Sequence, residues 1–300
     1  MKVLIPGGSG LIGRALTKNL LAEGHEVVIL SRVSQMKIPA GARLVQWDAR
    51  TPEGWVDELN GADAVVNLAG ATLDHRWTES YKKLAWDSRE NAGKAVSAAV
   101  AEVTQKPRVL IQSSAVGYYG PRDDQPVTED TPPADDFLAK ICVAWEASTQ
   151  PVEEQGVRRA VIRTGVVLSM EGGALPKLAM AMKLFAGGPL GSGKQVMSWI
   201  HIDDEVKAIR ALIDDDTASG AFNLTAPTPH TNRDLIKTLG KVMKRPAFMP
   251  APAFAIKLVF GEMSTVVLDG QRVLPKRLEE LGFAFDYPEL EAALRDILSA

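Results

Sequence analysis

Hydrophobic residues follow two alternating patterns through the first 168 residues. Short apolar runs typical of strands alternate with longer amphipathic segments, and we expect helices over 11–22, about 88–103 and about 135–155. The expected strands are KVLI, EVVIL, RLVQW, AVVNLA, RVLIQSS and RRAVIRTG. This alternation predicts an α/β fold, a Rossmann-type doubly wound parallel sheet whose strands are joined by crossover helices.

The pattern changes after Leu168. A glycine-rich turn, an apolar helix (LAMAMKLF) and the loop AGGPLGSGKQ follow, and from Thr231 onwards helical segments are separated by Pro and Gly. The run SWIHIDDEVKAIRALID predicts a strand end and a helix that return to the main sheet, and FNLTAP predicts one further strand. We therefore expect a nucleotide-binding domain of residues 1–168 plus about 196–225. A smaller, mainly helical substrate domain would take about 169–195 plus 226–300.

Composition narrows the class of protein. With 46% hydrophobic and 24% charged residues, the 300-residue chain can bury a substantial core, and its formal charge of -3 provides no basic field for nucleic acid or anionic lipid. Cys142 is the one cysteine, which rules out an internal disulfide, and with four histidines we expect no metal site. The first residues lack the apolar region of a signal peptide, and no apolar run reaches the roughly 18 residues of a membrane span. We expect a cytoplasmic protein with a small-molecule substrate; a homodimer stays open.

The stretch VLIPGGSGLIGRAL carries the first chemical motif. Gly7, Gly10 and Gly13 form G-x-x-G-x-x-G where the first strand meets the first helix. A dinucleotide site needs glycine there for a tight turn, for close approach of the backbone to a pyrophosphate and for helix–strand packing. The cofactor-binding residues predicted from this motif are Gly7, Ser9, Gly10, Leu11, Ile12 and Gly13, with amides at the helix N-terminus facing the anion. A glycine turn used for packing alone is the alternative.

The end of the second strand indicates which dinucleotide binds. An NAD site would usually place Asp or Glu there to hold the ribose 2′-hydroxyl, whereas this chain has Ser31 and Arg32. A guanidinium and a hydroxyl suit a 2′-phosphate, so we expect NADP(H). Asp48, at the end of the third strand, is expected to reach the adenine edge, although it would also be an ordinary loop residue.

Four further stretches, in this order and spacing, extend the evidence: VVNLAGA, SSAVGYYG, VIRTGVVLS and SWIHIDD. With the glycine loop, they make the chain resemble the extended short-chain dehydrogenase/reductases. More narrowly, it is similar over essentially its whole length to the atypical, epimerase-like branch often labelled nucleoside-diphosphate-sugar epimerase or cell-division-inhibitor-like. The stretches that carry this narrower resemblance are NLAGATLDHRW, DSRENAGK, GGPLGSGKQVMSWIHIDD and FGEMSTVVLDGQRVLPKRLEELGFAFDYPELEAAL. The resemblance implies NADP(H) as cofactor and backbone contacts from Leu68, Ala69 and Gly70. It also implies that Arg89 lies near the cofactor phosphates or the nicotinamide.

The catalytic pattern of that family is incomplete here. Its members carry a Ser or Thr after the fifth strand, matched by Ser114, and a Tyr-x-x-x-Lys in the next helix that supplies the proton. If Glu146 aligns with the family's acidic residue, the Tyr and Lys positions fall on Leu138 and Cys142, while Lys140 lies about 200° around the helix from Cys142. The predicted catalytic residues are therefore Ser114 and, as substitutes for the missing proton donor, the loop phenols of Tyr118 and Tyr119.

Four polar or aromatic side chains are candidates for substrate contact. They are Arg76 and Trp77 in DHRW, His201 in WIHIDD and Arg272, which we expect to reach an anionic substrate. His201 and Arg272 also have structural interpretations, as a tie between strand and core and as a paired surface arginine.

Three functions fit these residues. The first is an NADP(H)-dependent oxidoreductase acting on a small carbonyl or hydroxyl substrate. The second is a nucleotide-sugar epimerase or dehydratase, whose chemistry normally uses the missing Tyr. The third is a non-catalytic NADPH-sensing binding protein, which the missing pair favours. A complete substrate domain argues for the first.

Overall fold

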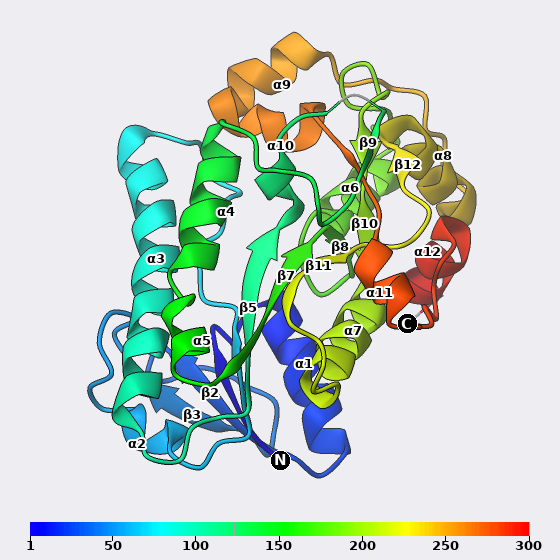
Figure 1. Cartoon of the computed structure of the whole chain (residues 1–300). Coiled ribbons are helices and arrows are strands. Elements are labelled where there is room, and N and C mark those ends of the chain that lie inside the picture. The colour runs from blue at the N-terminus through cyan, green and yellow to red at the C-terminus, as the bar shows by residue number, and fades with distance from the viewer. Residues whose placement is uncertain (123, 300) are drawn as a thin grey trace.

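A seven-stranded parallel sheet forms the centre of the molecule (Figure 1). The computed structural model describes residues 1–122 and 124–299. The strand order is β11-β7-β5-β4-β1-β2-β3. The strands are β1 (Lys2–Pro6), β2 (Glu26–Ser31), β3 (Arg43–Gln46), β4 (Ala64–Asn67), β5 (Val109–Ala115), β7 (Arg158–Thr164) and β11 (Gly220–Leu224). The chain winds outwards from β1 to β3 and then in the opposite direction from β4, which is the doubly wound arrangement predicted from the sequence.

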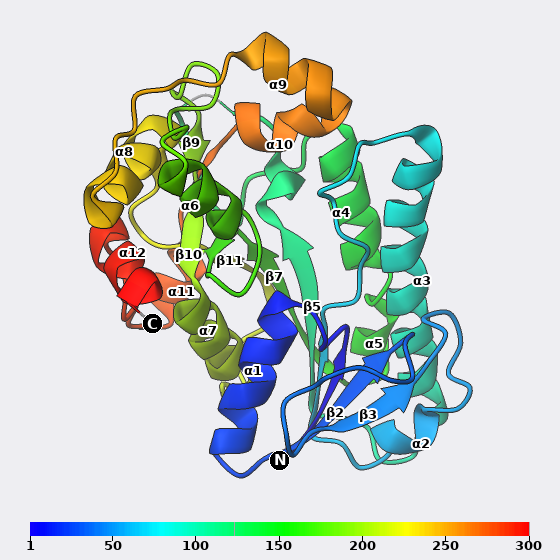
Figure 2. The same cartoon turned by 180° about the vertical axis from the view of Figure 1, so that it is seen from behind.

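Helices cover both faces of this sheet (Figures 1 and 2). On one face lie α1 (Leu11–Ala22) and α7 (Ile202–Asp214); on the other lie α2 (Val56–Leu59), α3 (Glu79–Glu102), α4 (Phe137–Ala147) and α5 (Pro151–Glu154). Alternate residues of β1 enter different cores, because Val3 and Ile5 pack on the first face and Leu4 on the second. Burial on both faces explains why the central strands are almost continuously apolar.

Two helices differ from the sequence prediction. Helix α3 begins at Glu79, well before the expected start near residue 88, and the side chain of Thr78 caps it by accepting from the Tyr81 amide at 3.2 Å. The single helix expected over about 135–155 is two helices, α4 and α5. Pro151 lacks the N–H that would continue the α4 hydrogen-bond ladder, so a new helix starts there.

The remaining elements gather beside the carboxyl ends of the central strands. The helices are α6 (Leu175–Lys183), α8 (Asn232–Met243), α9 (Ala253–Phe260), α10 (Thr265–Leu268), α11 (Lys276–Glu280) and α12 (Leu290–Ser299), with 3₁₀ turns η1 (Val116–Tyr119) and η2 (Gly261–Ser264). The short strands are β6 (Pro126–Val127), β8 (Val166–Leu168), β9 (Val196–Met197), β10 (Trp199–His201), β12 (His230–Thr231) and β13 (Arg272–Val273). Helices α6, α8 and α12 share a third hydrophobic cluster. The division into two domains stays a prediction.

Strand β10 corrects one expectation. It pairs with β8 in a separate two-stranded sheet and does not join the main sheet, although α7, which follows it, packs against β5 and β7. Among the described residues, no helix combines the length and the apolar composition that a bilayer crossing requires.

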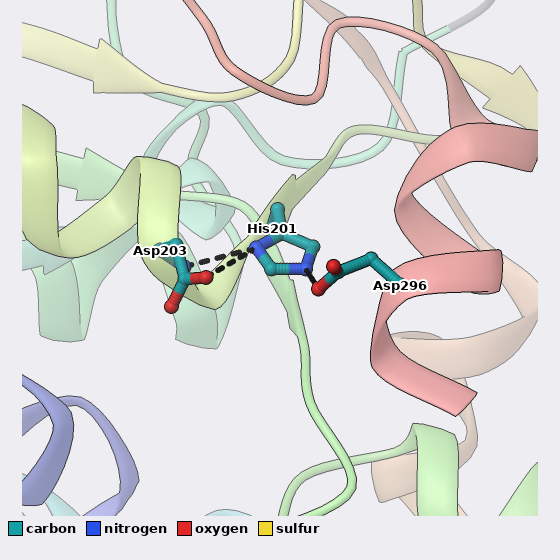
Figure 3. A group of neighbouring side chains, drawn as sticks. All are labelled: His201, Asp203 and Asp296. Atoms are coloured by element: carbon teal, nitrogen blue, oxygen red, sulfur yellow. Dashed lines mark hydrogen bonds and ion pairs between the residues drawn. The ribbon is translucent and has the colours of Figure 1, made fainter. Parts of the chain in front are cut away.

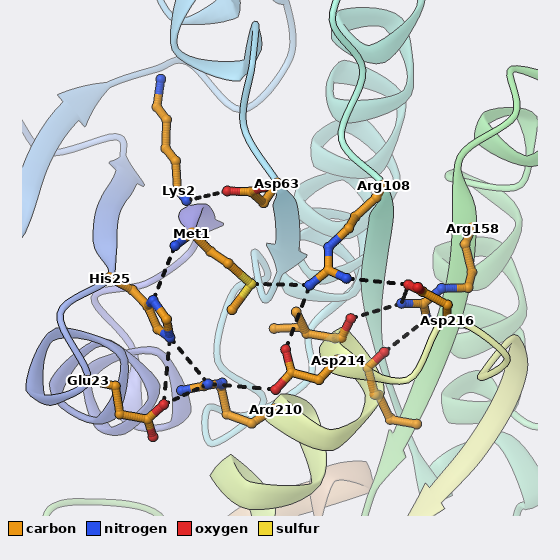
Figure 4. A network of polar contacts seen from close by, with 12 residues as sticks. Met1, Lys2, Glu23, His25, Asp63, Arg108, Arg158, Arg210, Asp214 and Asp216 are labelled. Carbon is orange, nitrogen blue, oxygen red and sulfur yellow. Dashed lines mark hydrogen bonds and ion pairs between the residues drawn. The ribbon is translucent and has the colours of Figure 1, made fainter.

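Charged side chains connect the elements at the amino edge of the sheet (Figure 4). Arg158 donates to the carbonyl oxygens of Leu212, Ile213 and Ala218 at 2.7–2.9 Å, and so it satisfies carbonyls at the C-terminal end of α7. Arg210 of α7 pairs with Glu23, directly after α1, at 2.8 Å. These contacts fix α1 and α7 against the sheet whose opposite edge carries the candidate site.

Candidate functional site

A pocket lies where the winding of the sheet reverses. Strands β1 and β4 are neighbours, and the loops that follow them, residues 7–10 and 68–70, lie in contact and together line a pocket of about 640 Å³. In doubly wound sheets, ligands bind in this crevice outside the carboxyl ends of the strands.

The glycine loop is shaped by close backbone contacts. Gly7 has a φ of +78°, and a Cβ there would lie 2.8 Å from the Cα of Ala69. A Cβ at Gly13 would lie 2.5 Å from the Cα of Gly8, so that glycine lets α1 pack directly on the loop. Gly10 is the N-cap of α1, and no described side chain caps this helix. The amides of its first turn, Leu11 to Gly13, are therefore free to face an anion.

The far end of the same pocket holds the residues expected to select the dinucleotide. Arg32 is exposed and has no ion-pair partner among the described residues, whereas the Ser31 hydroxyl accepts from the Val33 amide at 3.2 Å. Asp48 Oδ1 accepts from the amides of Arg50 and Thr51 at 2.7 and 2.8 Å. Burial works to raise the pKa of Asp48, but these hydrogen bonds outweigh it and hold the pKa below its usual value.

Most of the predicted cofactor residues share this pocket, although their roles stay predictions. Its walls include Gly7, Ser9, Gly10, Ser31, Arg32, Asp48, Leu68, Ala69 and Gly70. Leu11 instead turns its side chain into a groove beside α7, and Ile12 and Gly13 contribute backbone at the helix N-terminus.

A second cavity, of about 420 Å³, lies beyond the carboxyl ends of β5 and β7. Apolar side chains of α4 form one wall, Trp77 and Leu73 another, and η2 and α10 close the far side. Of the predicted substrate residues, Trp77 lines this cavity, and its ring meets Phe137 edge-on with centroids 5.3 Å apart.

Arg89 joins the pocket to the cavity. Its side chain is 8% exposed, packs 3.2 Å from the position of a Cβ on Gly70, and lines the cavity. Nη1 donates to the Ala85 carbonyl at 3.0 Å, and the guanidinium carbon lies 4.9 Å from the ring centroid of Trp145. Burial lowers the pKa of Arg89, but an arginine stays charged in proteins.

Ser114 and Tyr119, predicted to be catalytic, are occupied elsewhere. Glu146 and Arg163 form a buried ion pair with N–O distances of 2.9 Å; the Ser114 hydroxyl donates to Glu146 at 2.7 Å, and Arg163 lies 3.0 Å from the Tyr119 hydroxyl oxygen. Tyr119 is fully buried and donates to Asn223 at 2.6 Å, and burial raises its pKa to about 12. Neither side chain lines the cavity, so the structure gives both of them a role in stabilising the ion pair.

The other candidate phenol, Tyr118, also lies outside the cavity walls. The ring of Tyr118 stacks on Arg163, with the guanidinium carbon 3.5 Å from the ring centroid. Leu138 and Cys142, at the positions of the family's Tyr and Lys, do line the cavity, and burial raises the pKa of the Cys142 thiol to about 11. Lys140 points away and pairs with Asp135 at 2.9 Å. The described residues therefore provide no phenol or lysine in this cavity.

His201, a predicted substrate residue, lies between Asp203 and Asp296 (Figure 3) and is absent from the cavity walls. Its Nδ1 accepts from the Asp203 amide at 3.0 Å and so caps α7, while Nε2 lies 3.3 Å from Asp296 of α12. The ring is 1% exposed and stacks on Tyr287 at 3.9 Å. Burial lowers the pKa of His201, and the carboxylates of Asp203, Asp296 and Asp204 oppose this effect. The residue ties β10 and α7 to α12, and its substrate contact stays a prediction that these neighbours do not support.

The two arginines predicted to contact substrate also lie elsewhere. Arg272 forms an ion pair with Asp124 and is absent from the cavity walls. Arg76 is exposed, and its side chain packs against Gly261. Each guanidinium contacts a residue of a segment far away in the chain, and the sequence alone cannot place those segments side by side.

Several cavity residues were missed by the sequence analysis. Leu138, Ile141, Cys142 and Trp145 have the i, i+3, i+4, i+7 spacing of one helix face, a spacing that is typical of core packing. The spacing does identify a buried face; it contains no signal that part of the face borders a cavity.

Known proteins match this chain over the segments that form the sheet, the pocket and the C-terminal helices. A model described as the NAD dependent epimerase/dehydratase family matches residues 3–225, and a domain of unknown function, DUF1731, matches residues 251–297. An epimerase family protein of Staphylococcus aureus, SAB0724c, is 40% identical over 299 residues, which are 99% of this chain and 98% of that protein. The crystal structure of human epimerase family protein SDR39U1 (isoform 2) with NADPH matches with a TM-score of 0.91 and 34% identity, covering 100% of this chain and 99% of that chain.

A nucleoside-diphosphate sugar epimerase from Corynebacterium glutamicum is also similar, with a TM-score of 0.80 and 36% identity over 99% of this chain and 58% of that chain. The family model matches most of the chain, which agrees with the parallel sheet and with the pocket that the glycine loop lines. The chain therefore belongs to the NAD-dependent epimerase/dehydratase family, in the atypical, epimerase-like branch of the short-chain dehydrogenase/reductases.

Proposed function

We propose that this protein is an NADP(H)-binding oxidoreductase that acts on a small carbonyl or hydroxyl substrate. The observation that carries the proposal is the junction at Gly70 and Arg89. Gly70 lines the pocket of the glycine loop, Arg89 packs on it, and Arg89 also lines the second cavity. A dinucleotide extended across the switch point would bring its nicotinamide end to this junction.

The residues present fit such a cofactor. A side chain at Gly7 would collide with the Ala69 backbone, so the loop keeps a bare backbone facing the pocket, and the free amides at the N-terminus of α1 suit a pyrophosphate. Ser31 and Arg32 would take a 2′-phosphate, and Leu68, Ala69 and Gly70 would contact the cofactor through their backbone. A bound nicotinamide donates or accepts a hydride. A relative 34% identical to this chain is described with NADPH, which supports the choice of cofactor.

A non-catalytic NADPH-sensing protein is the second candidate. It is favoured by one observation: Ser114, Tyr118 and Tyr119 all lie outside the cavity walls. An epimerase or dehydratase acting on a nucleotide sugar has less support, because that chemistry normally uses the Tyr whose position is Leu138 here.

Turnover distinguishes the first two candidates. The purified protein is loaded with NADPH and mixed with a small-molecule extract of cells, and nicotinamide absorbance and fluorescence are followed together against a protein-free control. A faster fall of absorbance with protein supports the oxidoreductase, and fractionating the extract identifies the acceptor. Fluorescence that reports binding while absorbance stays constant in all fractions favours the sensor and contradicts the proposal.

A further inference from the structure

The second cavity has an apolar and aromatic lining. The α4 face of Leu138, Ile141, Cys142 and Trp145 forms one side, and Trp77 and Phe137, whose rings meet edge-on, also line the cavity. Trp77 and Trp145 are 8% and 7% exposed, so these rings are held rigidly by packing. Cavities lined in this way take ligands with a large apolar part, because burial of apolar surface supplies most of the binding free energy.

The charged lining excludes a strongly anionic ligand. Asp136, Glu262 and Asp269 contribute three carboxylates, and Arg89 is the one cationic side chain among the described residues that line the cavity. Asp136 caps α4 and Glu262 pairs with Lys82. A nucleoside diphosphate brings at least two negative charges, which would meet the carboxylates of Asp136 and Asp269 and one lining cation, since Glu262 is already paired with Lys82.

Arg89 is left without an anionic partner. No carboxylate among the described residues lies within 4.0 Å of its guanidinium, although the side chain is 8% exposed. Nη1 donates to Ala85, which uses one of the five N–H donors of the group. A buried cation is costly unless it is paired, and the planar guanidinium matches a carboxylate with two parallel hydrogen bonds.

We propose that the cavity binds a mainly apolar, ring-sized carbonyl compound with a single carboxylate, and that Arg89 binds this carboxylate. The volume of about 420 Å³ is near the lower end of the range for small-molecule sites, roughly 300–1,000 Å³, which suits a ligand of this size. The carbonyl group of the ligand and its position beside a cofactor rest on the proposed function. The binding of a carboxylate by Arg89 rests only on the cavity and on the position of Arg89 in it.

Calorimetric titration tests the ligand class directly. The probes are phenylpyruvate, phenylacetone, in which a methyl group replaces the carboxylate, and UDP-glucose. Each is titrated into the full chain without cofactor and with saturating NADP⁺, which prevents reduction of the probe. We expect phenylpyruvate to bind at least tenfold more tightly than phenylacetone, since one charge-assisted hydrogen bond is worth about that factor or more. We expect UDP-glucose to bind more weakly than phenylpyruvate.

Two variants locate the carboxylate site. Arg89→Met keeps an apolar stem and removes the charge, and we expect it to lose the preference for phenylpyruvate while phenylacetone binds as before. Unchanged binding of phenylacetone also shows that the variant is folded. Arg272→Met removes an arginine that the sequence analysis predicts to contact an anionic substrate. Because Arg272 is paired with Asp124, we expect this variant to bind phenylpyruvate as the wild type does.

Four results would overturn the proposal. The first is equal affinity of the wild type for phenylpyruvate and phenylacetone, and the second is tighter binding of UDP-glucose than of phenylpyruvate. The third is loss of phenylpyruvate binding in Arg272→Met and not in Arg89→Met. The fourth is loss of NADP⁺ affinity in Arg89→Met while phenylpyruvate binding is unaffected. The last result would assign Arg89 to the cofactor phosphates. A titration with NADPH alone separates the two proposals. Binding of phenylpyruvate through Arg89 without any binding of NADPH would refute the proposed function and leave the carboxylate site intact.

Discussion

Replacing Glu205 by glutamine should stabilise the protein at pH 8 and leave its stability nearly unchanged at pH 5. Glu205 lies on α7, is fully buried, and its Oε1 is 2.8 Å from the Thr164 hydroxyl oxygen. Oε2 has no hydrogen-bond partner among the described residues. Burial raises the pKa of this carboxyl from 4.5 to about 8, so the native protein holds it neutral at pH 7.

The sign and size of the effect follow from linkage. In the unfolded chain the carboxyl releases its proton near pH 4.5, whereas the native state keeps it until about pH 8. The unfolded state is therefore favoured progressively between these two values, and stability falls as pH rises. At about 1.4 kcal/mol per pKa unit, the loss between pH 5 and pH 8 is about 3 kcal/mol. Glutamine cannot ionise and keeps a hydrogen bond to Thr164, so the variant should lack this loss.

Urea unfolding of both proteins at half-unit steps from pH 5 to pH 8 measures the difference. All other titrating groups are shared by the two chains and cancel in the comparison. Glu53→Gln, at an exposed position, is the control and should keep the pH dependence of the wild type. If Glu205→Gln loses stability between pH 5 and pH 8 as steeply as the wild type does, Glu205 is ionised in the native protein and the reasoning is wrong.

Three further substitutions test the cofactor pocket and the sheet edge. Arg32→Ala should weaken NADPH binding about 10- to 150-fold and leave NADH binding unchanged, because one charge-assisted contact to the 2′-phosphate is lost; equal losses in fluorescence titrations would contradict that contact. Gly13→Ala should lower the free energy of unfolding by about 1–3 kcal/mol, since its Cβ would lie 2.5 Å from Gly8, whereas Gly172→Ala, with 3.6 Å to its nearest neighbour, should change little. Arg158→Met should cost about 2–4 kcal/mol in urea unfolding by removing three hydrogen bonds to carbonyls near the end of α7, and a cost near zero would show that water replaces them.

The sheet could be predicted from the sequence because its signal is local. Strands buried on both faces are apolar runs, and crossover helices carry one apolar stripe, so order and class follow from short windows. The start of α3 escaped the same reasoning, because its first turns are mostly polar and bury one narrow face through Ala85. The break between α4 and α5 had a visible signal in Pro151, which the apolar periodicity on either side obscured.

The two halves of the site differ in how much the sequence reveals. The glycine loop is a contiguous motif at a junction of strand and helix, so its place in the fold could be predicted from one short window. The second cavity has walls from α4, from Trp77 and from Val266 of α10, which are far apart along the chain. No periodicity in one segment reports a cavity that forms only when three segments meet.

The positions of the predicted catalytic hydroxyls have one physical explanation. Ser114 and Arg163 are paired in register on β5 and β7, so both side chains project from the same face of the sheet, towards Glu146 of α4. A buried ion pair is stable only if its remaining hydrogen-bonding groups are satisfied, and Ser114 and Tyr119 make those contacts. Burial opposes the charge of Arg163, yet its hydrogen bonds with Glu146 raise its pKa, so Arg163 stays charged. Neither Ser114 nor Tyr119 lines the cavity, so their predicted catalytic role has no support in this geometry.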